Sequence, residues 1–194
     1  MTQRRGLRLF VAVELPGEVA RGLGSVQDSL RARGLGRLRW VRPEGIHVTL
    51  KFLGETVAER VPSIAGALSR ATEGIAPHEV RLSTLGRFGS PRAPRVVWID
   101  VAGEVETLLR LQKQVEEHLA ALGIPPEQRA FSPHITLARV PPEIAAAVAA
   151  PLDDALASIS VPELAIPVRQ VSLMRSELRR DGAVYTRLDA ALLG

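Results

Sequence analysis

Two four-residue segments, HVTL at residues 47–50 and HITL at residues 134–137, repeat one pattern and use two of the four histidines in the chain. Side chains alternate between the two faces of a β-strand, so the histidine and the threonine of each segment share a face. The hydrophobic residues between and after them point to the opposite face. If the two strands face each other across a cleft, two imidazoles and two hydroxyls converge on one small site, which would suit metal-free phosphate chemistry.

Cleavage of a phosphodiester needs one group that takes a proton from the nucleophile and another that gives a proton to the leaving oxygen. A free imidazole has a pKa of about 6.5, so both of its forms are available near neutral pH. His47 and His134 are therefore our catalytic candidates. Thr49 and Thr136 would donate hydrogen bonds to the non-bridging oxygens. Strand alternation also places Lys51 on the face of the first histidine, where it would stabilise negative charge.

The composition is that of a globular protein of 194 residues with an unusual preference for arginine. Of the 25 basic residues only Lys51 and Lys113 are lysines, and the net charge is +4. Arginine binds phosphate bidentately, so this balance is compatible with a nucleic-acid partner. The absence of cysteine excludes disulfides, thiolate metal sites and a cysteine nucleophile. We see no signal peptide and no apolar run of the ~18 residues that a membrane helix needs, and we expect a cytoplasmic protein.

Hydrophobic periodicity predicts the order strand, helix, motif strand, helix, strand in each half of the chain. Pro151 lies inside the second helix of the second half and is expected to kink or divide it. The predicted strands cover residues 7–15, 46–53, 78–88, 95–101, 166–173 and 183–188, together with the strand that carries the second motif; the predicted helices occupy the segments after residues 16, 56, 103 and 140.

The two halves have matching spacings, which indicates an internal duplication. Val11 in the first strand precedes His47 by 36 residues, and Val97 precedes His134 by 37. We therefore expect one domain, 1–194, made of halves at about 7–90 and 95–190. The expected fold class is α+β and bilobal, with a pseudo-twofold axis and two mainly antiparallel sheets facing a central groove. A doubly wound parallel fold is disfavoured because no glycine-rich turn follows the first strand.

With these paired motifs the chain resembles the two-histidine phosphoesterase superfamily, whose signature is a pair of His-x-Thr motifs. Within it the chain is most similar to the RNA 2′,3′-cyclic phosphodiesterases, also called 2′-5′ RNA ligases. Four segments carry the resemblance: residues 8–13 (RLFVAV), 40–54 (WVRPEGIHVTLKFLG), 131–139 (FSPHITLAR) and 173–185 (LMRSELRRDGAVY). They are spread over nearly the whole chain.

The resemblance implies hydrolysis of an RNA-terminal 2′,3′-cyclic phosphodiester to a 2′-phosphomonoester, without a metal or another cofactor. His47 would be the proton donor to the leaving oxygen and His134 the proton acceptor that activates water. Thr49 and Thr136 would hold the phosphate. Some members of the family also join RNA ends through a 2′,5′ linkage, so reversible ligation is a second expectation.

Further substrate contacts are expected from an arginine and from aromatic residues. The resemblance makes Arg139 a substrate contact, but its position has the opposite parity from that of Thr136, so it reaches the site only if the strand bulges, twists or ends. Phe10 and Tyr185, and with them Phe52, are candidates for stacking on an unpaired base or for the core. Arginines could also line an RNA-binding rim or lie in solvated loops; these are Arg37, Arg39, Arg92 and Arg95.

Three other functions remain open from the sequence. A metal-dependent phosphodiesterase would use the motif histidines as ligands, although neither motif has a carboxylate at a suitable spacing. A non-catalytic protein could use both motifs only to grip an RNA end. The chain could also cleave another small cyclic phosphoester. For every alternative we expect a monomer without an obligate protein partner, because a duplicated chain builds both halves of the site itself.

Overall fold

Hydrophobic strands and amphipathic helices alternate in the computed structural model, which describes residues 6–179 and 182–194. Residues 180 and 181, which belong to the segment 173–185 that carries part of the resemblance, lie outside the described residues. The helices are α1 (Gly17–Leu30), α2 (Val61–Thr72), α3 (Val105–Ala120) and α4 (Ala145–Ser158). The strands are β1 (Leu7–Glu14), β2 (Arg39–Trp40), β3 (His47–Thr56), β4 (His78–Ser90), β5 (Ala93–Gly103), β6 (His134–Arg139), β7 (Ala165–Val168), β8 (Gln170–Arg179) and β9 (Gly182–Leu192).

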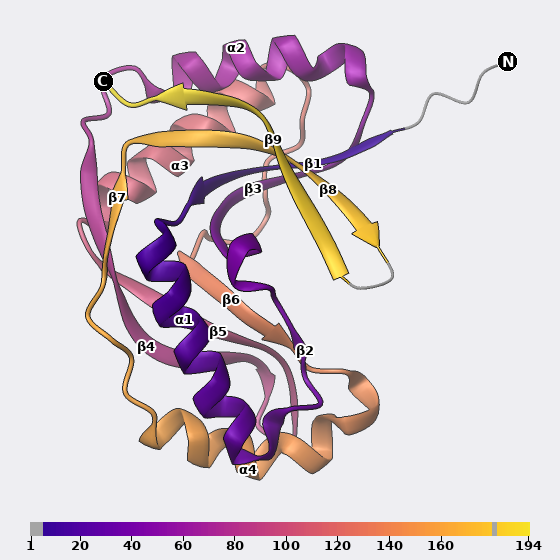
Figure 1. The fold of residues 1–194 in the computed structure, drawn as a ribbon. Coiled ribbons are helices and arrows are strands. Elements are labelled where there is room, and N and C mark those ends of the chain that lie inside the picture. The colour runs from indigo at the N-terminus through magenta and orange to yellow at the C-terminus, as the bar shows by residue number, and fades with distance from the viewer. Residues whose placement is uncertain (1–5, 180–181) are drawn as a thin grey trace, which may run out of the picture.

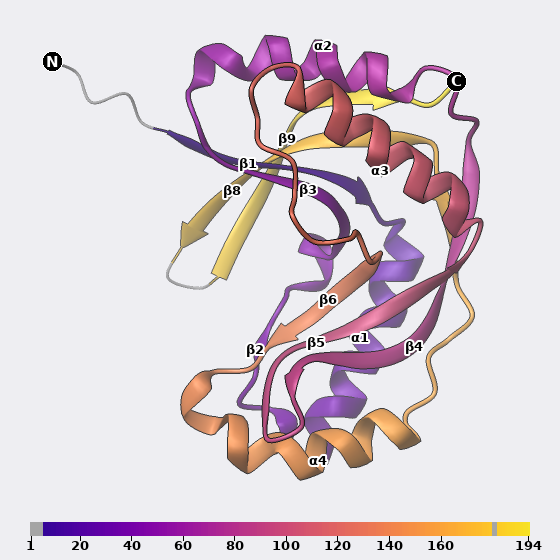
Figure 2. The same ribbon diagram turned by 180° about the vertical axis from the view of Figure 1, so that it is seen from behind.

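Among the described residues the nine strands form one antiparallel sheet. Its order is β7-β4-β5-β6-β3-β1-β8-β9, with the two-residue β2 paired to β6. The expectation of two separate sheets is therefore wrong in this detail. The sheet has two arms that meet where β3 lies beside β6, and Val48 paired with Ile135 is the single residue pair in the ladder between them. So short a junction lets the two arms diverge and curl (Figures 1 and 2).

Each arm and the helices packed on it form one lobe, and the predicted bilobal α+β architecture is confirmed (Figure 1). The upper lobe joins β3, β1, β8 and β9 to α2 and α3. The lower lobe joins β6, β5, β4 and β7 to α1 and α4. The lobes do not coincide with the sequence halves, because β4 pairs with β5 while β8 pairs with β1. Each half thus gives its third long strand to the other arm, and the duplication itself stays a prediction.

The helices form where the sequence predicts them because each buries one hydrophobic stripe. On α1 the stripe is Val19, Leu23, Val26 and Leu30, all buried, and Gly34 ends the helical segment with a φ of 84°. A side chain is strained at such a positive φ, whereas glycine adopts it freely. None of the helices in the described residues is long and apolar enough to cross a bilayer.

Several element boundaries differ from the prediction. Strand β3 continues past Gly54, which takes a φ of 68°, and ends at Thr56. Helix α4 runs through Pro151 without being divided. The strand predicted at 166–173 is two strands, β7 and β8, and the short β2 was not predicted. His78, the first residue of β4, is buried, and its Nδ1 lies 3.1 Å from the carbonyl oxygen of Ala76.

Candidate active site

The junction between the two arms brings the two His-x-Thr segments together. Because β3 and β6 are antiparallel and Val48 pairs with Ile135, the register sets His47 opposite Thr136 and Thr49 opposite His134. Directly opposite residues of an antiparallel pair have Cα atoms about 4.5–5.5 Å apart, and diagonal neighbours about 7–8 Å. The two histidines thus occupy one diagonal of a four-residue cluster, and the two threonines occupy the other. The four residues therefore flank the Val48–Ile135 pair where the two arms meet.

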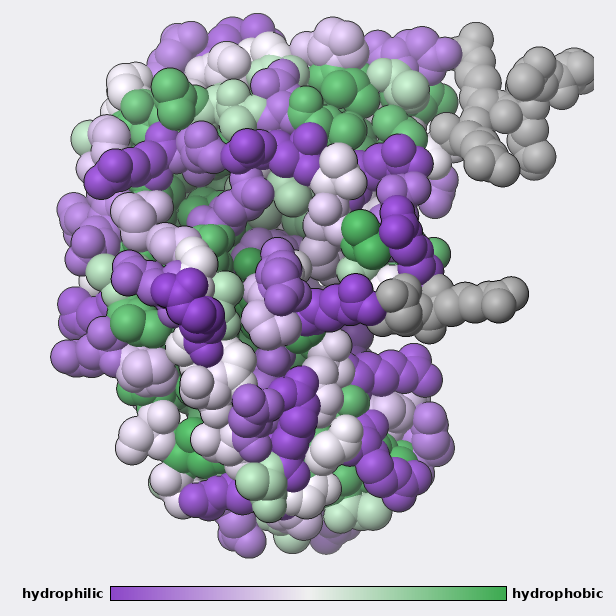
Figure 3. Space-filling view, in the orientation of Figure 1, coloured by the Kyte–Doolittle hydropathy of each residue, from purple (hydrophilic) through white to green (hydrophobic). Residues whose placement is uncertain are grey.

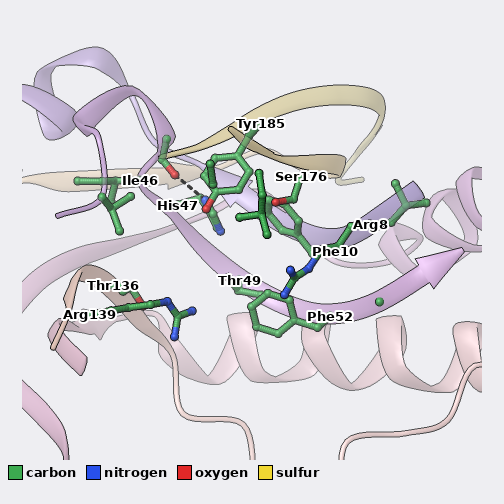
Figure 4. A pocket seen from close by; sticks show the side chains of 16 residues that line it. Arg8, Phe10, Ile46, His47, Thr49, Phe52, Thr136, Arg139, Ser176 and Tyr185 are labelled. Carbon is green, nitrogen blue, oxygen red and sulfur yellow. Dashed lines mark hydrogen bonds between the residues drawn. The ribbon is translucent and has the colours of Figure 1, made fainter. Parts of the chain in front are cut away.

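Both motif histidines are oriented by the same backbone contact. The Nδ1 of His47 lies 2.8 Å from the carbonyl oxygen of Gly45, and the Nδ1 of His134 lies 2.8 Å from the carbonyl oxygen of Ser132. A carbonyl can only accept, so each Nδ1 carries the proton and donates it. The Nε2 atoms are left as the groups that accept or donate a proton in chemistry. Figure 4 shows the bond of His47 at the wall of the site.

Aromatic rings pack against both imidazoles. The ring of Phe10 stacks on that of His47 at 4.7 Å, and the ring of Tyr185 meets it edge-on at 5.2 Å. His134 in turn meets Phe88 edge-on at 4.9 Å. Phe10 is only 2% exposed, so of the two roles left open for it, base stacking and the core, its burial favours the core, where its ring packs on the imidazole of His47.

Burial perturbs two titratable groups of this cluster. It lowers the pKa of His47 below its usual 6.5, because the charged imidazolium loses water, while the Gly45 carbonyl and Glu14 oppose the shift. Burial also raises the pKa of the Tyr185 hydroxyl above its usual 10, against the charges of Arg139 and Arg8. Glu14 itself accepts hydrogen bonds from Ser172 Oγ at 2.6 Å and from Arg187 at 3.1 Å.

A β-bulge in each motif strand changes which residues face the cluster. In β3 the register with β1 skips Leu50, and in β6 the register with β5 skips Leu137. An extra residue reverses the alternation that follows it. The fifth residue after each histidine, Phe52 or Arg139, therefore faces the groove. Arg139 was expected to reach the site only if its strand bulged, twisted or ended, and the bulge at Leu137 fulfils this condition.

The same bulge turns Lys51 away from the site, so its predicted contact with the substrate is wrong. The side chain of Lys51 is 1% exposed, and its Nζ donates to Glu116 Oε2 at 2.7 Å. It also donates to the carbonyl oxygen of Pro125 at 2.9 Å. The ion pair connects β3 to α3, and the bond to Pro125 connects β3 to the loop that follows α3.

A cavity of about 400 Å³ opens beside the cluster. The threonines of both motifs line it together with Arg8, Arg139, His47, Phe10, Phe52, Ser176, Leu178 and Tyr185 (Figure 4). Among the described residues no carboxylate lines it, and neither arginine forms an ion pair with another of them. His134 is not part of the lining. Figure 3 shows hydrophilic side chains over much of both lobes on this face, around a hollow beside the β8–β9 hairpin.

Several residues of the site were not predicted, or not in their actual role. Arg8 appears in the sequence only as one of many arginines, and its place in the cavity depends on the pairing of β1 with β3. Phe52 was only one of several aromatic candidates, yet it is 57% exposed and so offers a free ring face. The pair Phe88 and Trp98, whose rings lie 4.9 and 6.3 Å from that of His134, had no signal in the sequence beyond the aromatic residue type.

Comparison with known proteins gives a consistent picture. The model of the family described as LigT like Phosphoesterase matches the chain twice, at residues 13–98 and 99–185. An RNA 2′,3′-cyclic phosphodiesterase of Thermus thermophilus is 38% identical to the chain over 94% of its length and 88% of the relative. One of Methanothermobacter thermautotrophicus is 32% identical over 94% and 97%. The crystal structure of E. coli LigT complexed with 3′-AMP is 26% identical and has a TM-score of 0.72, covering 97% of this chain and 98% of the other.

Proposed function

The chain belongs to the LigT-like phosphoesterase family, and from this premise we propose that it is an RNA 2′,3′-cyclic phosphodiesterase that leaves a 2′-phosphomonoester. The observation that carries the proposal is the cluster of two imidazoles and two hydroxyls beside a cavity that, among the described residues, is lined by two arginines and by no carboxylate. The arginines of the cavity attract an anion, and the two imidazoles of the cluster supply an acid and a base. The names of the relatives at 32% and 38% identity point to the same reaction.

In the proposed reaction water attacks phosphorus and the bond from phosphorus to O3′ breaks. His134 Nε2 accepts the proton of the water, and His47 Nε2 gives a proton to O3′, so the product carries a 2′-phosphate and a free 3′-hydroxyl. The two threonine hydroxyls donate to the non-bridging oxygens. Arg139 and Arg8 offset the negative charge that grows in the transition state.

The lowered pKa of His47 suits the role of proton donor. An imidazolium whose pKa lies below 6.5 is a stronger acid than a free one and gives up its proton more readily. It is also less populated near neutral pH in the absence of substrate. A bound phosphodiester anion favours the protonated form, so substrate charge and the acid form of His47 stabilise each other.

RNA is the proposed substrate because basic residues continue beyond the cavity. Arg39 in β2 lies directly opposite Arg139 in β6, and its side chain is 73% exposed, with a loose ion pair to Glu143 at 3.9 Å. Like charges opposite each other on a sheet repel. A phosphate of the preceding nucleotide would relieve this repulsion, and the free face of Phe52 would receive a base.

The same groups would also support ligation. If the 5′-hydroxyl of a second RNA takes the position of the water, His134 accepts its proton and His47 again protonates O3′, which yields a 2′,5′ linkage. We propose that the chain acts as a monomer, because its two lobes contribute one motif strand each and so complete the site within one chain. The proposed location is the cytoplasm.

The test of this proposal is a panel of substrates incubated with excess chelator. We expect an RNA oligonucleotide with a 2′,3′-cyclic phosphate to be converted to the 2′-phosphate, and a 2′,3′-cyclic mononucleotide to be converted less efficiently. Loss of cleavage with chelator and its recovery with added metal would support the metal-dependent alternative. Binding of the oligonucleotide without turnover would support a protein that only grips RNA ends.

A further inference from the structure

A buried glutamine contacts each of the two bulges in the motif strands. Gln27 on α1 donates from Nε2 to the carbonyl oxygen of Leu137 at 3.1 Å, and Gln112 on α3 donates from Nε2 to that of Leu50 at 3.4 Å. Leu137 and Leu50 are the extra residues of the two bulges. The glutamines are 0% and 8% exposed. The structure thus makes one unusual contact twice, once in each lobe and each time from the helix that follows the first strand of a half.

These glutamines are not explained by packing. The extra residue of a bulge has no partner in the ladder that it interrupts, with β5 for Leu137 and with β1 for Leu50, and a glutamine amide donates to its carbonyl oxygen in each case. Methionine at position 27 would fill similar space, since α1 otherwise buries valine and leucine. It would offer no donor to Leu137. The Oε1 of Gln27 is buried and has no partner among the described residues, so the side chain tolerates an unpaired oxygen while its amide nitrogen holds the bulge.

We infer that Gln27 is a positioning residue that holds the bulge at Leu137 and thereby keeps the Arg139 side chain on the groove face. Gln112 does the same for Phe52 through the bulge at Leu50. Without the bulge, alternation would return each fifth residue to the core face. The inference rests on the proposed function only where it assigns Arg139 and Phe52 to substrate binding.

The contact made by Gln27 is the tighter of the two. Its Nε2 also donates to the carbonyl oxygen of Val41 at 2.7 Å, and the backbone N–H of Val41 donates to the carbonyl of Leu137 at 2.9 Å. Gln27 therefore joins the chain that follows β2 to the bulge, next to the place where Arg39 lies opposite Arg139. The Nε2 of Gln112 lies closer to Glu116, at 3.2 Å, than to the Leu50 carbonyl, at 3.4 Å. We therefore expect replacement of Gln27 to have the larger effect on activity.

The test is a pair of crossed double-mutant cycles on the cleavage of a cyclic-phosphate RNA oligonucleotide. Gln27→Met should lower kcat/KM by roughly 10- to 100-fold, the scale of a misplaced substrate contact. In combination with Arg139→Gln it should cause no further loss, because the contact that it positions is already gone. With Phe52→Ala the two losses should multiply. Gln112→Met should show the reverse pattern and serves as the matched control.

A purely structural role would give a different result. Losses from Gln27→Met that multiply with those from Arg139→Gln, or an unchanged kcat/KM in Gln27→Met, would overturn the inference. Urea unfolding of each variant confirms that the assay is made on folded protein. If Gln27→Met does not fold, Gln27→Asn replaces it, because the amide is kept but falls one methylene short of Leu137, and the same coupling to Arg139→Gln is required.

A crystal structure of the Gln27 variant separates this inference from the proposed function. We expect the register between β5 and β6 to lose its shift at residue 137 and Arg139 to leave the cavity. An unchanged bulge would refute the positioning role even in an active enzyme. If the parent protein cleaves no cyclic phosphate, the proposed function fails, and the crystal structure still decides whether the glutamine holds the bulge.

Discussion

Replacing Lys51 by methionine separates a structural from a substrate-binding role for this residue. The change removes a 2.7 Å ion pair to Glu116 and a 2.9 Å bond to Pro125, both made by a side chain that is 1% exposed. Breaking a buried ion pair on one side costs about 3–5 kcal/mol. Glu116 retains 15% exposure and a hydrogen bond from Gln112, which soften the loss. We therefore expect unfolding to become easier by about 2–3 kcal/mol.

The assay combines urea unfolding with steady-state cleavage of a cyclic-phosphate oligonucleotide. In a chain of this length about 1 kcal/mol moves Tm by 2–4 °C, so the expected fall in Tm is roughly 4–12 °C. The value of kcat/KM, measured well below Tm, should stay within about twofold of the parent. Adding Glu116→Gln should recover part of the stability, because the remaining charge is removed. A variant with full stability and a large increase in KM would refute the reasoning and return Lys51 to the substrate.

Other predictions follow from burial, packing and charge. Because burial lowers the pKa of His47 below 6.5, the unfolded chain binds more protons between that lowered pKa and 6.5, so stability should fall as pH decreases through this window. His47→Gln should remove that fall in urea titrations, and an unaltered pH slope would contradict it. A Cβ at Gly86 would overlap the ring of Trp98, which packs near His134, so Gly86→Ala should lower kcat by roughly tenfold. Gly66→Ala is the control and should leave kcat unchanged, because a Cβ at this position of α2 has room. Arg139→Gln should reduce the slope of log KM against log salt by about 0.7, the value for one phosphate contact of a single strand; an unchanged slope would mean that Arg139 binds no phosphate.

The sequence predicts the elements of this fold better than their partners. Helix α1 forms where a stripe of buried valine and leucine side chains predicts it, and both motif strands lie where expected. The exchange of β4 and β8 between the arms could not be predicted, because periodicity reports which face of a strand is buried and not which strand lies beside it.

The predicted site is correct up to the bulges and fails beyond them. Strand alternation places His47 and Thr49 on one face, as the structure does, and then assigns Lys51 to the same face although it is buried on the other. Neither bulge contains a glycine that would have signalled it, and each accepts a hydrogen bond from a distant side chain, such as the amide of Gln27 for Leu137. Such tertiary contacts leave no mark on the local pattern of the motif strand.

The central claim is that two histidines, one from each arm, catalyse cleavage of an RNA-terminal cyclic phosphate. The most direct measurement is the conversion of a 2′,3′-cyclic-phosphate oligonucleotide to its 2′-phosphate in excess chelator by the parent, His47→Ala and His134→Ala. We expect conversion by the parent. The kcat of each variant should be lower by about 10²- to 10⁴-fold, which is the typical contribution of a proton-transfer group. Parent activity that survives either substitution would contradict the account.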